Sequence, residues 1–132
     1  MTLVVDTSAL MAIVLGESDA EQFVAALIEH TGDACMSAAT LVECEIVIEA
    51  RQGAEALSDL QRVIERVGIE VVPFDADHAR LATTAWRRFG KGRHPASLNL
   101  GDCFSYALAK SLRAPLLYKG QDFRQTDIVS WF

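Results

Sequence analysis

The stretch "TLVVDTSALMAIVLG", residues 2–16, indicates the fold class because it places a short apolar strand directly before an apolar helix. Residues 2–6 are rich in β-branched side chains and end on an acid, which predicts a buried strand. A helix is predicted for residues 8–15, ending near Gly16. Because a strand followed by a helix recurs along the chain, we expect parallel strands with helices packed against them.

The same alternation continues to the end of the chain. Further strands are predicted at residues 34–37, 69–74 and 114–118, with a last short one at 127–131. Further helices are predicted at residues 18–32, 38–52, 54–67, 75–89 and from about 100 onward, the first of them opened by a capping box in "SDAE", 18–21. The fold class is therefore α/β, with a mostly parallel sheet of about four to five strands flanked by helices, in a single domain over residues 1–132.

Composition limits the class of protein. The chain has 132 residues, of which 51% are hydrophobic and 23% charged, as in a globular domain with a sizeable core. Its longest apolar runs are too short to span a bilayer, and its start lacks a secretory pattern, so we expect a cytoplasmic protein without a membrane partner. Three cysteines without metal-ligand spacing, Cys35, Cys44 and Cys103, are expected to be reduced and packed as small apolar side chains.

Charge is unevenly distributed along the chain. The net charge is −6, and residues 1–50 contain no Lys or Arg. Residues 78–101 contain no acid, and their basic residues are Arg80, Arg87, Arg88, Lys91 and Arg93. An acidic chain with one basic segment is compatible with an anionic substrate that meets an acidic centre.

Acids fall where strands end or core helices begin. Asp6 ends the first strand and Asp122 follows the strand at 114–118. Asp102 lies in the first turn of the apolar helix in "LNLGDCFSYALAK", residues 98–110. Each has an ordinary structural explanation, as a helix cap, a helix-terminus charge or a turn residue. However, sites in open α/β sheets form at the carboxyl ends of the strands, where these acids would meet.

Glu43 is predicted on the inward face of the helix at residues 38–52. At about 100° per residue it shares that face with Ala39, Ile46, Val47 and Ala50. Four converging carboxylates, those of Asp6, Glu43, Asp102 and Asp122, would repel one another unless a divalent cation neutralised them. Ligands that are all oxygen suit Mg²⁺ or Mn²⁺, which also bind phosphate oxygens.

The ordered motifs "VVDTSAL", "SAATLVECEIVIEA", "LNLGDCFSYALAK" and "PLLYKGQDF" resemble those of PIN-domain ribonucleases, most closely the VapC-type toxins of type II toxin–antitoxin modules. The resemblance covers essentially the whole chain and implies a three-layer PIN-like fold. It assigns Asp6, Glu43 and Asp102 to the three most dependable acidic positions of the family. By the same resemblance, Ser8 matches the small hydroxyl residue that often supports the first acid, Asp6. Asn99 matches a polar residue commonly found near the third acid, Asp102.

One position departs from the family pattern. Gly120 stands where many members carry a fourth acid, after the last core strand. Asp122 is our candidate for that role and Asp127 the weaker substitute. The number of metal ions, one or two, is left open by this departure.

The resemblance also implies an activity and partners. The activity is Mg²⁺-dependent endoribonuclease action as a toxin, with hydrolysis of RNA phosphodiester bonds by water that the metal activates. The partners are the cognate antitoxin and a second copy of the chain in a homodimer. Leu41 and Ile48 lie opposite Glu43 on an unusually apolar helix, so they are candidates for such an interface, and a plain core position is the alternative.

The RNA contacts are predicted in the basic segment. The candidates are Arg87, Arg88, Lys91 and Arg93, with Lys119 beside the acids. Trp86 and Phe89 are interleaved with them and would either stack on unpaired bases or anchor their helix in the core. The sequence does not identify which RNA is cut.

Two other classes of protein compete with this interpretation. A phosphoaspartate receiver-like protein would also use acids at strand ends and a late lysine, but it needs paired acids after the first strand, and "VVDTSA" has one. A non-catalytic protein-interaction module with the same fold would tolerate Gly120, but it gives no reason for retaining Asp6, Glu43 and Asp102 together. No histidine has a serine or cysteine partner in a recognisable nucleophile motif.

Overall fold

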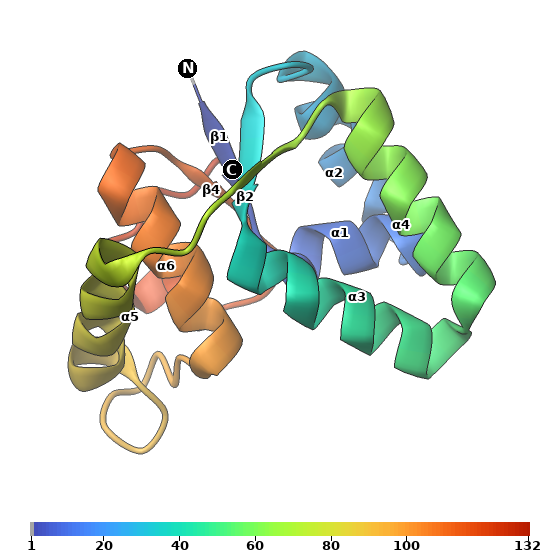
Figure 1. The fold of residues 1–132 in the computed structure, drawn as a ribbon. Coiled ribbons are helices and arrows are strands. Elements are labelled where there is room, and N and C mark those ends of the chain that lie inside the picture. Colours follow the sequence, from blue (N-terminus) through green and yellow to red (C-terminus); the bar gives the residue numbers. More distant parts are fainter. Residues whose placement is uncertain (1) are drawn as a thin grey trace.

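The structure is a computed structural model that describes residues 2–132, and its centre is a parallel sheet (Figure 1). The sheet has the order β3-β2-β1-β4, and every pairing is parallel. Its strands are β1 (Leu3–Val5), β2 (Ala34–Ser37), β3 (Glu70–Val72) and β4 (Leu116–Leu117). The α/β fold class and these four strands confirm the sequence prediction.

The predicted strand at residues 127–131 is wrong. There the chain makes a single bridge between Leu116 and Ser130, with hydrogen bonds from Leu116 N to Val129 O and from Trp131 N to Leu116 O. Because β4 is only two residues long, it offers too short an edge for a further regular strand.

Six α-helices connect the strands within the described residues, and one short 3₁₀ helix follows the last strand. They are α1 (Thr7–Val14), α2 (Ala20–Glu29), α3 (Ala38–Gln52), α4 (Ala54–Val67), α5 (Ala76–Phe89), α6 (Leu100–Leu112) and η1 (Asp122–Gln125). The capping box predicted at residues 18–21 is wrong, since Asp19 is the N-cap of α2 and its side chain makes no capping hydrogen bond within residues 2–132. Sequence analysis also missed η1, which carries Asp122.

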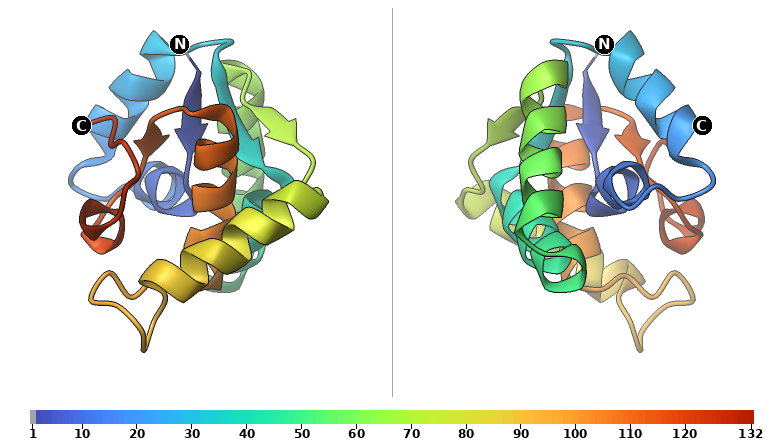
Figure 2. Two further views of the ribbon diagram at one scale, coloured as in Figure 1. Left: turned by 90° about the vertical axis from the view of Figure 1, so that its left-hand side faces the viewer. Right: turned by 90° about the vertical axis from the view of Figure 1, so that its right-hand side faces the viewer.

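Alternation along β1 divides the helices into two layers. Val4 faces a core cluster that includes Ala85 of α5 and Tyr106 of α6. Leu3 and Val5 face the opposite cluster, built with residues of α1, α2, α3 and α4. Figure 2 shows α5 and α6 on one side of the sheet and α1, α2 and α4 on the other. The fold therefore has three layers, helices–sheet–helices, as the resemblance implied.

The buried face of α3 differs from the prediction. Ile48 is fully buried and Leu41 packs against the same core, because α1 and α4 cover this side of the helix. Val42 and Ile46 are instead the exposed apolar side chains, with exposed fractions of 56% and 63%. The core alternative therefore holds for Leu41 and Ile48, and the placement of Ile46 and Ala50 on the inward face was wrong.

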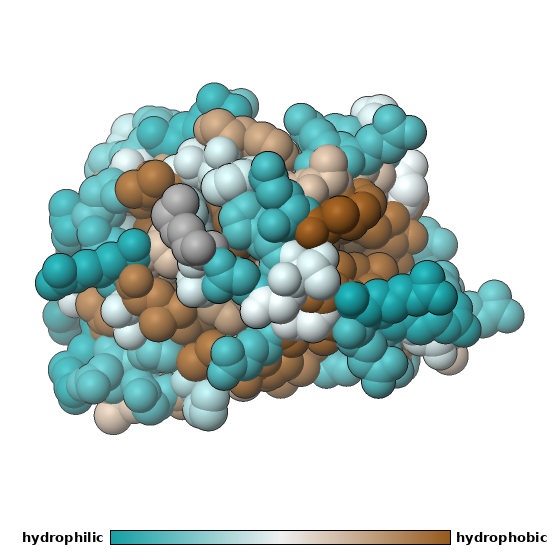
Figure 3. Space-filling model, turned by 90° about the horizontal axis from the view of Figure 1, so that it is seen from above, coloured by the Kyte–Doolittle hydropathy of each residue, from teal (hydrophilic) through white to brown (hydrophobic). Residues whose placement is uncertain are grey.

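The end of the molecule opposite the carboxyl ends of the strands has a mixed surface. Figure 3 shows hydrophilic and hydrophobic residues interspersed on this face.

Within residues 2–132, no helix has the length and apolar character needed to cross a membrane. Cys35, Cys44 and Cys103 are buried free thiols, as expected.

Candidate metal centre

The predicted acids meet in one cavity at the carboxyl ends of β1 and β4. The cavity has a volume of about 290 Å³. It is lined by the four predicted acids and both predicted supporting residues, Asp6, Glu43, Asp102, Asp122, Ser8 and Asn99, together with Thr7, Met11, Val47, Arg51, Lys119 and Phe123. A larger, mostly apolar hollow of about 620 Å³ borders α5 and α6 and shares Asn99 with it.

Asp6 is the most firmly held of the four acids. It is the N-cap of α1 and only 4% exposed. Its Oδ2 accepts hydrogen bonds from the Ser8 backbone N–H at 3.1 Å and from the Ser8 hydroxyl at 2.6 Å. Its Oδ1 accepts a hydrogen bond of 2.5 Å from the buried hydroxyl of Ser105. Both carboxylate oxygens are therefore held in place by hydroxyl donors.

Ser105 is a site residue that sequence analysis missed. It lies on α6 three residues after Asp102, and its oxygen is 3.4 Å from the buried Thr40 hydroxyl of α3. Residues three apart share a helix face, so this spacing from Asp102 was the one available signal. Within the apolar run "CFSYALA", the serine cannot be distinguished by sequence from a small core residue.

Ser8 also connects two strand ends. Its Oγ accepts a hydrogen bond of 2.9 Å from the backbone N–H of Lys119, just beyond β4. The same hydroxyl donates to Asp6. Ser8 therefore fixes the segment after β4 against the first acid, consistent with the supporting position predicted for it.

Glu43 reaches the cavity from α3. Its Oε1 accepts a hydrogen bond of 2.7 Å from the Thr7 hydroxyl. Burial raises the pKa of the Glu43 carboxyl, the Thr7 hydrogen bond opposes that shift, and the negative charge of Asp6 adds to it. The carboxylate lies against Gly101 of α6, where a side chain on that residue would collide with it.

Asp102 forms a capping box with Asn99 at the start of α6. The Asp102 N–H donates to Asn99 Oδ1 at 2.8 Å, and the Asn99 N–H donates to Asp102 Oδ2 at 3.0 Å. Burial raises the pKa of Asp102 to about 7, and the charges of Asp6 and Asp122 contribute, although the hydrogen bond from Asn99 lowers it. The Asp102 carboxyl therefore resists ionisation in this acidic, buried position.

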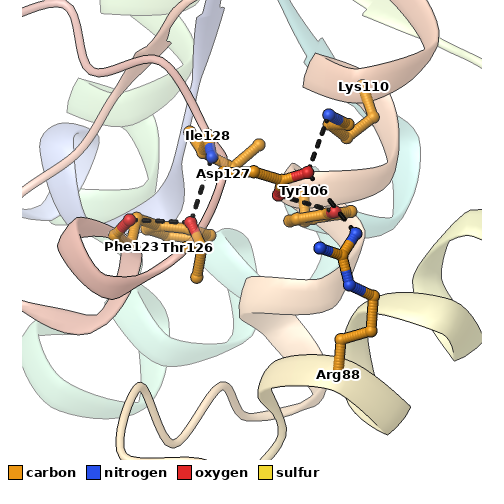
Figure 4. Close-up of polar contacts among 7 residues, drawn as sticks. All are labelled: Arg88, Tyr106, Lys110, Phe123, Thr126, Asp127 and Ile128. Atoms are coloured by element: carbon orange, nitrogen blue, oxygen red, sulfur yellow. Dashed lines mark hydrogen bonds and ion pairs between the residues drawn. The ribbon is translucent and has the colours of Figure 1, made fainter.

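Asp122 and Asp127 occupy different environments. Asp122 begins η1 and lines the cavity beside Asp102. Asp127 does not line it, and Figure 4 shows its carboxylate directed at Tyr106, Lys110 and Arg88. Its oxygens accept hydrogen bonds from the Tyr106 hydroxyl at 2.8 Å and from Lys110 Nζ at 3.0 Å. The position of Asp122 thus favours it over Asp127 as the fourth acid.

The predicted RNA-contact residues are spread over several environments. Lys119 lines the cavity, but its ammonium is paired with Glu17 at 2.9 Å and with Asp19 at 3.0 Å. Arg93 lies over the ring of Trp86, which is 46% exposed. Phe89 is buried, so its core alternative holds.

The remaining basic side chains are exposed. Arg87 and Lys91 are exposed, and Arg88 is 3.5 Å from Asp127. The basic segment thus lies on α5 and the following loop, with Lys91 beside the apolar hollow and not in the acidic cavity.

The donor chemistry of the cavity fits a hard divalent cation. Its acids are all carboxylates, and burial together with neighbouring negative charge raises the pKa of two of them, Glu43 and Asp102. Within residues 2–132 no three acid, histidine or cysteine side chains stand close enough to hold an ion as they are. A cation that binds here would therefore have to draw the carboxylates closer together.

Comparisons with known proteins identify the family and the fold. Residues 3–129 match the PIN domain family. The chain is 48% identical over 128 residues to Ribonuclease VapC30 of Mycobacterium tuberculosis, covering 97% of both chains. The structure is similar to that of M. tuberculosis VapC20, described as a sarcin-ricin loop cleaving toxin, with a TM-score of 0.79 and 17% identity over 97% of both chains. It is also similar to DNA-bound VapBC from Salmonella typhimurium, with a TM-score of 0.75 and 18% identity over 98% of this chain and 96% of the other.

Proposed function

The chain belongs to the PIN domain family, among the VapC-type ribonuclease toxins, and we propose that its acidic cavity is where it hydrolyses RNA. The observation that carries the proposal is the convergence of Asp6, Glu43, Asp102 and Asp122 on one cavity at the strand ends. These four residues are the proposed catalytic and metal-binding groups, and Ser8 and Asn99 are their supports. The receiver-like alternative is not supported, because it needs paired acids after the first strand. The residue after Asp6 is Thr7, whose hydroxyl donates a hydrogen bond to Glu43.

Divalent metal dependence is general in PIN ribonucleases, and Mg²⁺ or Mn²⁺ is the proposed ion here. Such an ion would stabilise charge on the phosphoryl oxygens and activate a water for attack on phosphorus. Hydrogen bonds from neighbouring side chains orient the carboxylates that would bind the ion. Ser8 and Ser105 fix both oxygens of Asp6, and Thr7 holds one oxygen of Glu43. Asp102, with a pKa of about 7, must release its proton before it can bind a cation.

The proposed substrate is RNA, approached partly through the basic segment. Arg87, Lys91 and Arg93 are exposed and would contact phosphates without reading sequence. Arg93 over Trp86 forms a cationic and aromatic surface on which an unpaired base can stack. Three buried free thiols are consistent with action in the reducing cytoplasm, where RNA is available.

An antitoxin is the expected protein partner, because similar structures include a VapBC assembly. We further propose a homodimer. Among the described residues, large apolar side chains are exposed on four helices, α2, α3, α5 and α6, and those we assign to the interface are Val42 and Ile46 on α3, Trp86 on α5 and Leu100 on α6. Exposed apolar surface of this kind is typical of an interface. Ile46→Glu with Leu100→Glu is expected to yield a monomer in light scattering, whereas the parent protein scatters as a dimer; equal masses would exclude this interface.

Cleavage of total cellular RNA tests the proposed activity. The purified protein is incubated with Mg²⁺ or Mn²⁺, and separately with chelator, beside Asp102→Asn and a surface control, Asp77→Asn. Asp77 is exposed and paired with Arg80, away from the cavity. Discrete fragments are expected from the parent and Asp77→Asn with metal only. Fragments from Asp102→Asn at the parental rate, or in chelator, would overturn the proposal.

A further inference from the structure

Arg51 is a basic residue of the acidic cavity that the sequence analysis did not single out. It lies in the last turn of α3 and lines the cavity together with Glu43 and Val47 of the same helix. These three residues are spaced four apart, which places them on one face of α3. It is also the first Lys or Arg in the chain. Arg51 therefore forms part of the wall of the acidic cavity.

Arg51 also differs from the other cation of the cavity. Lys119 is held in ion pairs by Glu17 and Asp19. Arg51 is exposed and makes no ion pair with any residue that the structure describes. Among the described residues that line the cavity, Arg51 is thus the cation whose charge remains available to a ligand.

A phosphodiester that enters this cavity meets four carboxylates. A bound divalent metal would offset part of their charge, but phosphates flanking the cleaved bond would still face an acidic surface. A guanidinium can form two parallel hydrogen bonds with phosphate oxygens. We propose that Arg51 binds a phosphate of the RNA backbone at the rim of the cavity. This inference rests on the proposed function, since it assigns a substrate contact to the same site.

A purely structural role makes a different prediction. A cation in the last turn of a helix interacts favourably with the helix dipole and stabilises the fold. Arg66 holds the equivalent place in the last turn of α4, is exposed and does not line the acidic cavity. Arg66→Gln is therefore a matched control for Arg51→Gln, because both variants remove one helix-end charge.

The experiment measures cleavage and binding of one fluorescent single-stranded RNA of mixed sequence. Arg51→Gln is expected to raise KM roughly tenfold, as for loss of a charge-assisted contact. Binding, measured in the Asp102→Asn background, should lose about 0.7 from the slope of log affinity against log salt concentration, as for one phosphate contact. Arg51→Lys should recover part of both effects, and Mn²⁺ affinity should stay at the parental value.

Two outcomes would overturn the proposal. In one, Arg51→Gln and Arg66→Gln give the same KM and the same salt slope, which assigns Arg51 to helix stability. In the other, Arg51→Gln weakens only the complex with the antitoxin, which assigns it to the protein partner. A parent protein that cleaves no RNA with any metal would refute the proposed function instead, and the binding comparison would still decide the role of Arg51.

Discussion

The carboxylate of Glu43 occupies the space that a β-carbon on Gly101 would need. Gly101 is buried in the first turn of α6, next to Asp102. Gly101→Ala is therefore expected to displace the Glu43 carboxylate while the helix stays folded, because alanine is a good helix former. We expect RNA cleavage to fall roughly 10- to 100-fold, as for a misplaced catalytic group. Cleavage rate and thermal unfolding would be measured on the same preparation.

A double-mutant cycle isolates the cause of this effect. Glu43→Asp shortens the side chain, so it should cost less activity in the Gly101→Ala background than in the parent. Strictly additive losses would mean that Gly101 acts independently of Glu43.

Ser105 is expected to position Asp6. Ser105→Ala removes the buried donor to Asp6 Oδ1, and we expect roughly tenfold weaker Mn²⁺ binding, the typical value of a hydrogen bond to a charged group. Isothermal titration with Mn²⁺ checks this. The control is Ser111→Ala on the exposed side of α6, which should bind Mn²⁺ like the parent. Equal affinities for both variants would remove Ser105 from the site.

The metal-free protein is expected to lose stability as pH rises. The pKa of Asp102 is about 7 in the folded protein against 3.8 for the free side chain, so between these values the folded state binds more protons than the unfolded state. The free energy of unfolding therefore falls as pH rises from about 4 to 7, and the raised pKa of Glu43 acts in the same direction.

Melting temperatures in chelator at pH 5.5 and pH 8 measure this dependence. Asp102→Asn should flatten it, because the amide does not titrate. Mg²⁺ should stabilise the parent more at pH 8 than at pH 5.5, since it binds the ionised carboxylates. A melting temperature that rises with pH in chelator, and equally so in Asp102→Asn, would contradict the account.

Substitutions at Asp122 and Asp127 are expected to have different effects, the first on function and the second on stability. Asp122→Asn should lower Mn²⁺ affinity or RNA cleavage roughly tenfold or more with little change in thermal unfolding. Asp127→Asn should retain cleavage and reduce the free energy of unfolding by about 1 kcal/mol, because it weakens the contacts with Tyr106 and Lys110. Urea unfolding and RNA cleavage of both variants provide the comparison, and interchanged effects would make Asp127 the fourth acid.

The alternation of strands and helices could be predicted from the sequence because local patterns determine it. Asp6 follows a β-branched run, and the glycines after α3 and α4, Gly53 and Gly68, mark their ends. Strand ends meet at one edge of a parallel sheet, so the convergence of the acids followed from their positions in the chain.

The remaining features depend on tertiary packing. Ser105 donates to Asp6 across 99 residues of sequence, and a serine in an apolar helix gives no sign of such a contact. The exposed face of α3 depends on where α4 packs, which explains why Ile48 is buried and Ile46 is not. Likewise, the choice between Asp122 and Asp127 required the position of Tyr106 and Lys110.

Anomalous diffraction from crystals of this protein grown with Mn²⁺ would locate the ion and show whether these four acids form a metal centre. We expect a peak in the acidic cavity, about 2.1 Å from carboxylate oxygens of Asp6 and Asp102, with Glu43 or Asp122 completing the site directly or through water. The peak should disappear in Asp102→Asn crystals. A fully occupied Mn²⁺ elsewhere, with the cavity empty at saturating concentration, would contradict the claim that these acids form the metal centre.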